Sequence, residues 1–313
     1  ATTAKMPEPE SVQGITVKDV EFTYPTSTQP FIKNCDLDLP RGSRCLLIGA
    51  NGAGKTTLLQ IVAGKYMVGQ DMVRVLGRPP FHDMALTCSG QLSYLGTSWR
   101  KDVAFAGYGV ALQGDISAGK LIWGVEGVDP ARRAALVSLL DIDLYQRTNT
   151  MSDGQRRRVQ ICMGLLKPYD VLLLDEITVD LDVVGRLQLL DFFKRECEER
   201  GATILYATHI FDGLEAWVTH VAYMEGGQVV KGGPVASLPE IGRVVAAASN
   251  GAGGAPTHKL LHTVEGWLGE EKKVRQAASD AAKAAGHAPS LETAVQPTRT
   301  PVYMPSKHLA FFR

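Results

Sequence analysis

The sequence predicts an α/β fold in which helices cover a mostly parallel sheet. Short continuous apolar runs, such as RCLLIG (44–49), DVLLLD (170–175) and ATILYAT (202–208), are typical of buried strands. Stretches with helical spacing of apolar residues lie between these runs. Strand–helix–strand alternation with apolar strands indicates a parallel sheet with both faces covered.

Composition limits the possible folds and ligands. The 313 residues can form one large domain or two modest ones, and 45% of them are apolar, enough for an ordinary core. Lysine plus arginine and aspartate plus glutamate are equal at 33 each, so nucleic acid is not expected as the main ligand. The five cysteines are widely spaced without a CxxC pair, which favours reduced thiols in an intracellular protein and no zinc site.

The first part of the chain reads as a tail, two strands and a helix. Residues 1–13 are small, polar and proline-containing, and we expect them to be disordered. ITVKDVEFTY (15–24) and CDLDLP (35–40) alternate apolar and polar residues, as half-buried strands do. KTTLLQIVAG (55–64) has helical spacing and ends in glycine.

The middle of the chain changes from strands to helices. Residues 71–95 indicate strands with turns, and 98–148 are richer in helical patterns. Asp129 can cap one such helix, with Pro130 at its first position. Further helices are expected from about 153 and over about 183–200.

The composition shifts after about Pro239. AAASNGAGGAPT (246–257) is typical of a linker. The next 29 or so residues place apolar side chains at helical intervals, so we expect an amphipathic helix that packs either on the chain's own core or on a partner. No third ligand accompanies His258 and His262, so a metal site is not expected there. The spaced apolar residues are Leu260, Val264, Trp267, Leu268 and Val274.

A phosphate-binding loop follows the strand at 44–48. GANGAGKT fits the pattern G-x-x-x-x-G-K-[ST] without mismatch and stands between a strand and a helix, as the chemistry requires. Glycines allow successive backbone N–H groups to face phosphate oxygens, and the helix directs its positive end at the same charge. Lys55 is expected to reach the β- and γ-phosphates, and Thr56 to bind Mg²⁺. The predicted nucleotide-binding residues of this segment are Gly49, Ala50, Asn51, Gly52, Ala53, Gly54, Lys55, Thr56 and Thr57.

Two carboxylates end the strand at 170–175. Asp175 follows four apolar residues, the position expected for a second magnesium ligand. Glu176 comes next and can orient and polarise the attacking water. The pair predicts the catalytic edge of an ATPase of the P-loop class.

Further motifs in the right order give the chain a family resemblance. Ser152-Asp153-Gly154-Gln155 before a basic helix resembles the signature of ABC-type ATPases. Tyr24 resembles their adenine-stacking aromatic residue, Asp182 their aspartate loop, and His209 their switch histidine at the γ-phosphate. The resemblance covers about residues 14–240 and implies a mixed parallel sheet core, an antiparallel β subdomain and a helical signature subdomain.

The resemblance also implies a head-to-tail homodimer. In that family, ATP on one phosphate loop is closed over by the partner's signature, whose hydroxyl and N–H groups bind the γ-phosphate at a helix N-terminus. The signature residues Ser152, Asp153, Gly154 and Gln155 would then act in trans, and Asp182 would couple the two sites. Arg156 to Arg158 are expected to form a solvated helix face or an interface.

The chain departs from the common family pattern at several places. Asp153 replaces a glycine, and its carboxylate must point away from a γ-phosphate. Thr97 falls near the family's magnesium-binding glutamine but cannot replace it with equal reach. MSDGQRRRVQI, DEITVDLD and YATHIFDGL together look like the soluble, stand-alone ABC ATPases similar to the plant I-subfamily and to a fungal protein associated with transcription regulation.

We therefore expect a disordered tail at 1–13, an ABC nucleotide-binding domain at 14–240, and a linker, amphipathic helix and extended tail at 241–313. The expected function is MgATP binding and hydrolysis for regulation, with an unidentified protein partner, in the cytoplasm and also the nucleus. The alternatives are the ATPase subunit of a multi-chain transporter and a nucleotide-gated scaffold with negligible turnover. The chain does not begin with Met, so a removed transit peptide is compatible with it.

Overall fold

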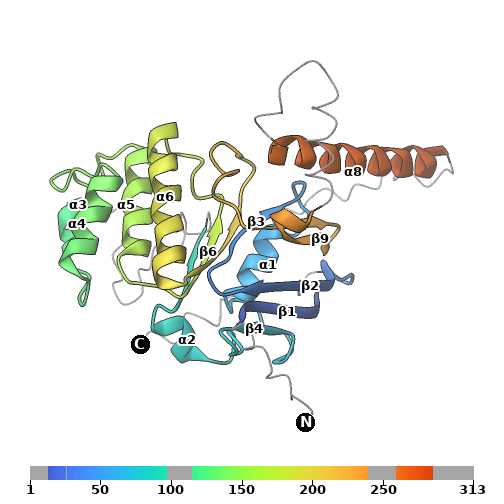
Figure 1. Ribbon diagram of the computed structural model, residues 1–313, viewed down its shortest axis with the longest axis horizontal. Helices are drawn as coiled ribbons and strands as arrows, with labels where there is room; N and C mark the ends of the chain where they lie inside the picture. Colours follow the sequence, from blue (N-terminus) through green and yellow to red (C-terminus); the bar gives the residue numbers. More distant parts are fainter. Residues whose placement is uncertain (1–12, 26, 97–114, 239–258, 285–313) are drawn as a thin grey trace, which may run out of the picture. The chain divides into compact units, whose positions relative to one another are not determined.

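The computed structural model describes residues 13–25, 27–96, 115–238 and 259–284. The chain divides into two compact units, Ala1–Leu268 and Gly269–Arg313. Within the first unit the described residues form two sheets with helices against them (Figure 1).

The larger sheet carries the strands that were expected to be buried. Its strand order is β5-β6-β7-β3-β8-β9, in which β5, β6, β7, β3 and β8 run parallel and β9 pairs with β8 antiparallel. The mixed, mostly parallel sheet of the predicted α/β fold is thus confirmed. The strand bounds are β3 (Arg44–Ile48), β5 (Leu92–Leu95), β6 (Val171–Asp175), β7 (Thr203–Ala207), β8 (His220–Glu225) and β9 (Gln228–Pro234).

The smaller sheet is antiparallel, with the order β2-β1-β4. Its strands are β1 (Gln13–Phe22), β2 (Ile32–Pro40) and β4 (Val73–Val75). This sheet matches the antiparallel β subdomain that the resemblance implies. Apolar and polar residues alternate along β1 because one face of this sheet is covered and the other is not. Ile15 and Val17 are buried, whereas Lys18 is exposed.

The helices begin where local capping groups allow. The side chain of Asp129 accepts hydrogen bonds from the backbone N–H groups of Ala131 and Arg132, with Pro130 in the first turn, as the sequence predicts. The helices of the described segments are α1 (Lys55–Val62), α2 (Met84–Cys88), α3 (Ala118–Trp123), α4 (Pro130–Leu139), α5 (Asp153–Leu165), α6 (Val183–Arg200), the short 3₁₀ helix η2 (Val235–Ser237) and α8 (Lys259–Ala284).

Both faces of the parallel sheet are buried, which explains its continuous apolar strands. Cys45 and Leu47 of β3 belong to a core shared with α1 and the smaller sheet. Leu46 and Ile48, the alternate residues of the same strand, belong to a core shared with α5 and α6. Figure 1 shows these two helices side by side. Burial raises the pKa of the Cys45 thiol, so this cysteine is an apolar core residue without reactive character.

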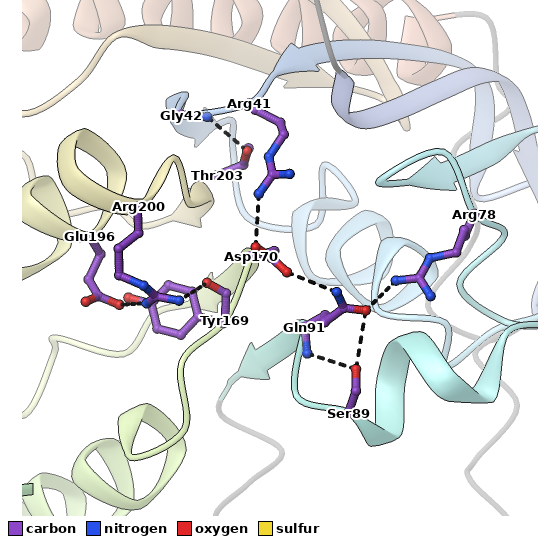
Figure 2. Close-up of polar contacts among 10 residues, drawn as sticks. All are labelled: Arg41, Gly42, Arg78, Ser89, Gln91, Tyr169, Asp170, Glu196, Arg200 and Thr203. Atoms are coloured by element: carbon purple, nitrogen blue, oxygen red, sulfur yellow. Dashed lines mark hydrogen bonds and ion pairs between the residues drawn. The ribbon is translucent and has the colours of Figure 1, made fainter. Parts of the chain in front are cut away.

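A polar network joins the amino ends of the strands (Figure 2). Asp170, just before β6, accepts hydrogen bonds from Arg41 at 2.9 Å and from Gln91 Nε2 at 3.2 Å. The Gln91 side chain in turn accepts from Arg78. Nearby, Arg200 donates to the carbonyl of Tyr169, next to Asp170, and pairs with Glu196. We call the six side chains Arg41, Arg78, Gln91, Asp170, Glu196 and Arg200 the amino-end network.

The first turns of α8 pack on the core of the first unit. Leu260, Val264 and Trp267 are buried, and the Trp267 ring lies 5.3 Å from that of Tyr223. Glu215 Oε1 accepts a hydrogen bond of 2.7 Å from the Leu260 N–H at the start of the helix. The helix was expected to pack either on the chain's own core or on a partner. Leu260, Val264 and Trp267 pack on the chain's own core. Among the segments described here, no helix has the length and apolar character that a membrane crossing requires.

Candidate nucleotide-binding site

The glycine-rich loop joins β3 to α1 and lies against β8. A Cβ atom on Gly49 would come within 2.2 Å of the carbonyl oxygen of Met224. One on Gly54 would come within 2.8 Å of the side chains of Ile32 and Met224, and Gly54 has a φ of 110° as the residue before α1. Close backbone packing therefore requires both glycines, and the loop amides gather at the amino end of α1.

Lys55 is folded over its own loop. Its Nζ donates hydrogen bonds to the carbonyl oxygens of Gly49 at 2.7 Å and Ala50 at 3.0 Å. An ammonium group beside a loop of this kind can bind phosphate oxygens. The phosphate-binding role that the motif predicts for Lys55 stays a prediction.

The two predicted magnesium ligands lie together. The Thr56 hydroxyl, in the first turn of α1, donates to Asp175 Oδ1 at the end of β6, at 3.2 Å. Burial raises the pKa of Asp175, and the hydrogen bonds that it accepts partly offset that shift. A hydroxyl and a carboxylate form the oxygen donor set that Mg²⁺ prefers, so these residues fit the ion.

Sequence reasoning missed Tyr94 as a neighbour of this pair. Its hydroxyl, from β5, donates to Asp175 Oδ2 at 3.2 Å. A polar aromatic residue near the carboxyl end of a predicted strand beside β6 is the sequence signal that points to it. That signal needs the strand order β5-β6, which the sequence does not show.

Glu176 and His209 meet at the same edge of the sheet. His209 Nδ1, in the loop after β7, lies 2.8 Å from Glu176 Oε2. Glu176 has a φ of 53°, which is uncommon for a residue other than glycine, and its N–H donates to the carbonyl of Ala207 at 2.9 Å. Backbone strain of this kind is concentrated at functional sites. His209 is 67% exposed, so its ring can also meet a ligand.

Tyr24 lies in an aromatic cluster beside α1. Its hydroxyl shares a hydrogen bond of 2.7 Å with the Thr57 hydroxyl, and its ring makes edge contacts with Phe22, Phe31 and Tyr66. The predicted adenine-stacking residue is thus tied to the phosphate loop helix. Phe31 and Tyr66 were not predicted, because they come near Tyr24 only through the fold.

The signature residues begin helix α5. Ser152 Oγ accepts from the Gln155 N–H at 3.2 Å, and the Gln155 side chain accepts from the Ser152 N–H at 2.9 Å, which forms a capping box. A Cβ on Gly154 would lie 3.5 Å from the carbonyl oxygen of Asp180. The Asp153 side chain is 95% exposed and pairs with Arg156 at 3.2 Å. It therefore points to solvent in the single chain.

Asp182 caps α6, and its Oδ1 accepts from the Gly185 N–H at 2.9 Å. Its other carboxylate oxygen lies 3.8 Å from Arg158 Nη2 of the signature helix. The amino ends of α5 and α6 are thus linked within one chain. Thr97 lies outside the described residues.

The prediction that Arg156 to Arg158 form a solvated helix face or an interface is wrong for the middle residue, Arg157, which is buried. Arg157 is 3% exposed, and its Nη1 lies 3.5 Å from both the Gly96 carbonyl oxygen and Gln160 Oε1. Helical spacing turns this position inward, against the end of β5. Arg158 remains partly exposed and lies 3.3 Å from Asp141.

The fold and these motifs define a P-loop protein with an ABC cassette. A family model described as "ABC transporter" matches residues 32–179. ABC transporter I family member 21 of Arabidopsis thaliana is 51% identical over 300 residues, which cover 96% of either chain. CCR4-associated factor 16 of Saccharomyces cerevisiae is 39% identical over 251 residues, covering 76% of this chain and 84% of the relative. The chain belongs to the ABC ATPase family.

Solved structures agree on the fold. An ATP-binding subunit of an ABC transporter has a TM-score of 0.59 at 22% identity and covers 80% of this chain and 98% of its own. A dimeric bacterial ABC transporter cassette has a TM-score of 0.56 at 20% identity, with coverage of 71% and 98%. At this identity the likeness concerns the cassette fold alone.

Proposed function

We propose that this chain binds MgATP and hydrolyses it to ADP and phosphate. The observation that carries the proposal is the contact of Thr56 with Asp175 beside the loop that holds Lys55. Magnesium bound by Thr56 and Asp175 would neutralise charge on the β- and γ-phosphates. The loop amides and the amino end of α1 would bind the same phosphates.

The catalytic roles in this proposal belong to Glu176 and His209. Glu176 orients the attacking water and polarises it as it approaches the γ-phosphate. His209, whose Nδ1 lies 2.8 Å from Glu176 Oε2, contacts the γ-phosphate in this proposal. Tyr24 stacks on adenine, in the cluster where its hydroxyl bonds to Thr57.

We further propose that two copies pair head to tail, so that the signature of one completes the site of the other. Ser152 Oγ uses its acceptor capacity in the capping box, and the hydroxyl proton can be donated to a γ-phosphate. Asp182, next to the signature helix through Arg158, couples the two sites. The dimeric bacterial cassette of the same fold supports this arrangement.

Mixed dimers test the shared site directly. Lys55→Ala and Ser152→Ala should each be inactive alone, because every site then lacks one part. An equimolar mixture should regain about one quarter of the wild-type phosphate release, since half the random dimers hold one intact site. Two copies of the Lys55→Ala chain mixed after separate tagging are the control. A mixture that stays as inactive as its components would contradict the shared site.

We also propose a regulatory role, in the cytoplasm and nucleus, with the nucleotide-binding domain at 14–240. The likeness to CCR4-associated factor 16 over 76% of this chain supports a role through a protein partner, because that relative is named for its association with another factor. A transport role is the second candidate, because an energy-coupling factor transporter ATP-binding protein of Latilactobacillus sakei is 33% identical over 230 residues. Affinity purification of ATP-trapped Glu176→Gln chain separates the two roles. A polytopic membrane protein in stoichiometric amount would support transport and contradict regulation.

A further inference from the structure

The carboxylate of Asp175 is held at both oxygens by hydroxyl groups from two different elements. Thr56 of α1 donates to Oδ1, and Tyr94 of β5 donates to Oδ2, each at 3.2 Å. Tyr94 lies one strand away from Asp175 in the parallel sheet, where it pairs with Leu173 of β6. Its side chain reaches along the edge of the sheet to the last residue of the neighbouring strand.

The two hydrogen bonds fix the plane of the carboxylate. Oδ1 faces Thr56, the other residue that fits the magnesium ion, whereas Oδ2 is occupied by the Tyr94 hydroxyl. Without that hydroxyl, the buried carboxylate could rotate about its terminal bond, which has a broad torsional preference. Partners of this kind orient metal ligands, and their loss typically weakens metal binding.

Tyr94 is itself held from two sides. The Nζ of Lys65 lies 4.1 Å from the centre of its ring. Gly96 packs against the hydroxyl so closely that a Cβ atom there would come within 2.3 Å of it. The hydroxyl therefore has little freedom to leave Asp175, and a side chain at position 96 would displace it.

We propose that Tyr94 is a positioning residue for magnesium binding: its hydroxyl holds Asp175 Oδ2 so that Oδ1 is presented to the ion beside Thr56. This inference rests on the proposed binding of MgATP. It assigns to β5 a part in the site that neither the phosphate loop nor the carboxylate motif contains.

The test is the magnesium dependence of nucleotide affinity in Tyr94→Phe. Binding of a fluorescent ATP analogue is measured by titration in EDTA and at increasing Mg²⁺ concentration. We expect the affinity in EDTA to stay within about twofold of wild type, because the phosphate loop is unchanged. The Mg²⁺ concentration that gives half of the affinity gain should rise about tenfold or more.

Two further variants complete the design. Gly96→Ala should shift the Mg²⁺ requirement in the same direction, since it displaces the Tyr94 hydroxyl. Tyr145→Phe, at a side chain that is 91% exposed, removes a phenol hydroxyl elsewhere and should match wild type. Thermal unfolding of all the chains without nucleotide reports any general damage.

The outcomes separate the two proposals. A wild-type chain that binds no nucleotide would overturn the proposed function. A wild-type chain with normal MgATP binding beside a Tyr94→Phe chain with an unchanged Mg²⁺ requirement would overturn only the role of Tyr94. An equal loss of affinity in EDTA and in Mg²⁺ would also overturn it, because a positioning residue for the ion does not act on the metal-free complex.

Discussion

The carboxylates at the two ends of the parallel sheet have different neighbours. At the amino end, the carboxylates Asp170 and Glu196 are paired with arginines of the same chain (Figure 2). At the carboxyl end, Asp175 accepts hydrogen bonds from two hydroxyls, and Glu176 lies against an imidazole. We call Lys55, Thr56, Asp175, Glu176 and His209 the carboxyl-end site.

This contrast separates groups that maintain the fold from groups that are available to a ligand. Charges that pair within the chain compensate one another, and removing one member of a buried pair destabilises the fold because the other charge is left uncompensated. A carboxylate that accepts from hydroxyl groups, as Asp175 does, keeps the capacity to bind a cation. Ligands of open α/β sheets bind at the carboxyl ends of the strands, and the carboxyl-end site lies at that end of the sheet.

The largest expected effect is at the carboxyl-end site. Glu176→Gln should lower the rate of phosphate release by about 10²–10⁴-fold, because the amide cannot polarise the attacking water. The free energy of unfolding without nucleotide should change by less than about 0.5 kcal/mol. Phosphate release and urea unfolding are measured on the same preparation, with the exposed Glu199→Gln as the matched control. Equal rates for Glu176→Gln and wild type would mean that this carboxylate is not catalytic.

The second expected effect is at the amino end, where a substitution should lower stability and leave turnover unchanged. Arg132 of α4 donates from both terminal nitrogens to the two oxygens of Glu196, at 2.8 and 2.9 Å, in a nearly buried pair. Glu196→Gln leaves Arg132 and Arg200 uncompensated and should cost about 3 kcal/mol of unfolding free energy. Urea unfolding measures the loss.

The same variant should retain its turnover per folded chain. Phosphate release is therefore measured well below the unfolding midpoint and normalised to the folded fraction. A Glu196→Gln chain with wild-type stability and slow turnover would contradict the assignment of stability to the amino end.

The third expected effect is a small gain in stability when the Asp175 carboxylate is replaced by an amide. Burial raises the pKa of Asp175 above its ordinary value, so the ionised form is disfavoured in the folded chain. A raised folded-state pKa stabilises the fold below the unfolded pKa, and this contribution is lost as the pH rises through the folded pKa. At neutral pH in EDTA, Asp175→Asn should therefore raise the unfolding free energy by up to about 1 kcal/mol.

Urea unfolding at pH 7 and at pH 4 measures this gain, which should shrink at the lower pH as the wild-type carboxyl gains its proton. Magnesium-dependent nucleotide binding should be lost at either pH. A variant that is less stable than wild type at pH 7 would show that the carboxylate contributes to the fold.

The smallest effect is expected for the partly exposed part of the amino-end network. Arg41 and Asp170 form an ion pair of 2.9 Å with side chains 37% and 30% exposed. Arg41→Gln should cost less than about 1 kcal/mol, because solvent screens such pairs. The difference from wild type in thermal unfolding should shrink further in concentrated NaCl. A loss as large as that of Glu196→Gln would show that burial does not separate the two pairs.

Local motifs made much of the site predictable. GANGAGKT must form a loop before a helix because its glycines and its place after an apolar strand allow little else. Asp175 and Glu176 end an apolar strand for the same reason, and the structure brings Asp175 to Thr56. The sequence also placed Ser152 to Gln155 before a helix, and the structure begins α5 at Asp153.

Contacts between distant segments were not predictable. Arg157 was expected on a solvated face or an interface but is buried against the end of β5. The rotation of α5 about its axis determines which of the three consecutive arginines faces inward. Tyr94 reaches Asp175 only because β5 and β6 are neighbours. The aromatic neighbours of Tyr24 and the amino-end network likewise join residues far apart in the chain.

The fold class, the family and the kinds of side chain expected at the nucleotide site follow from the amino-acid sequence alone, because glycine geometry, helix capping and strand burial act over a few residues. The hydrogen bonds to each oxygen of Asp175, the burial of Arg157 and the ion pairs at the amino end follow only from the folded arrangement of the chain. Those facts depend on strand order and helix rotation, which arise when the whole core packs at once.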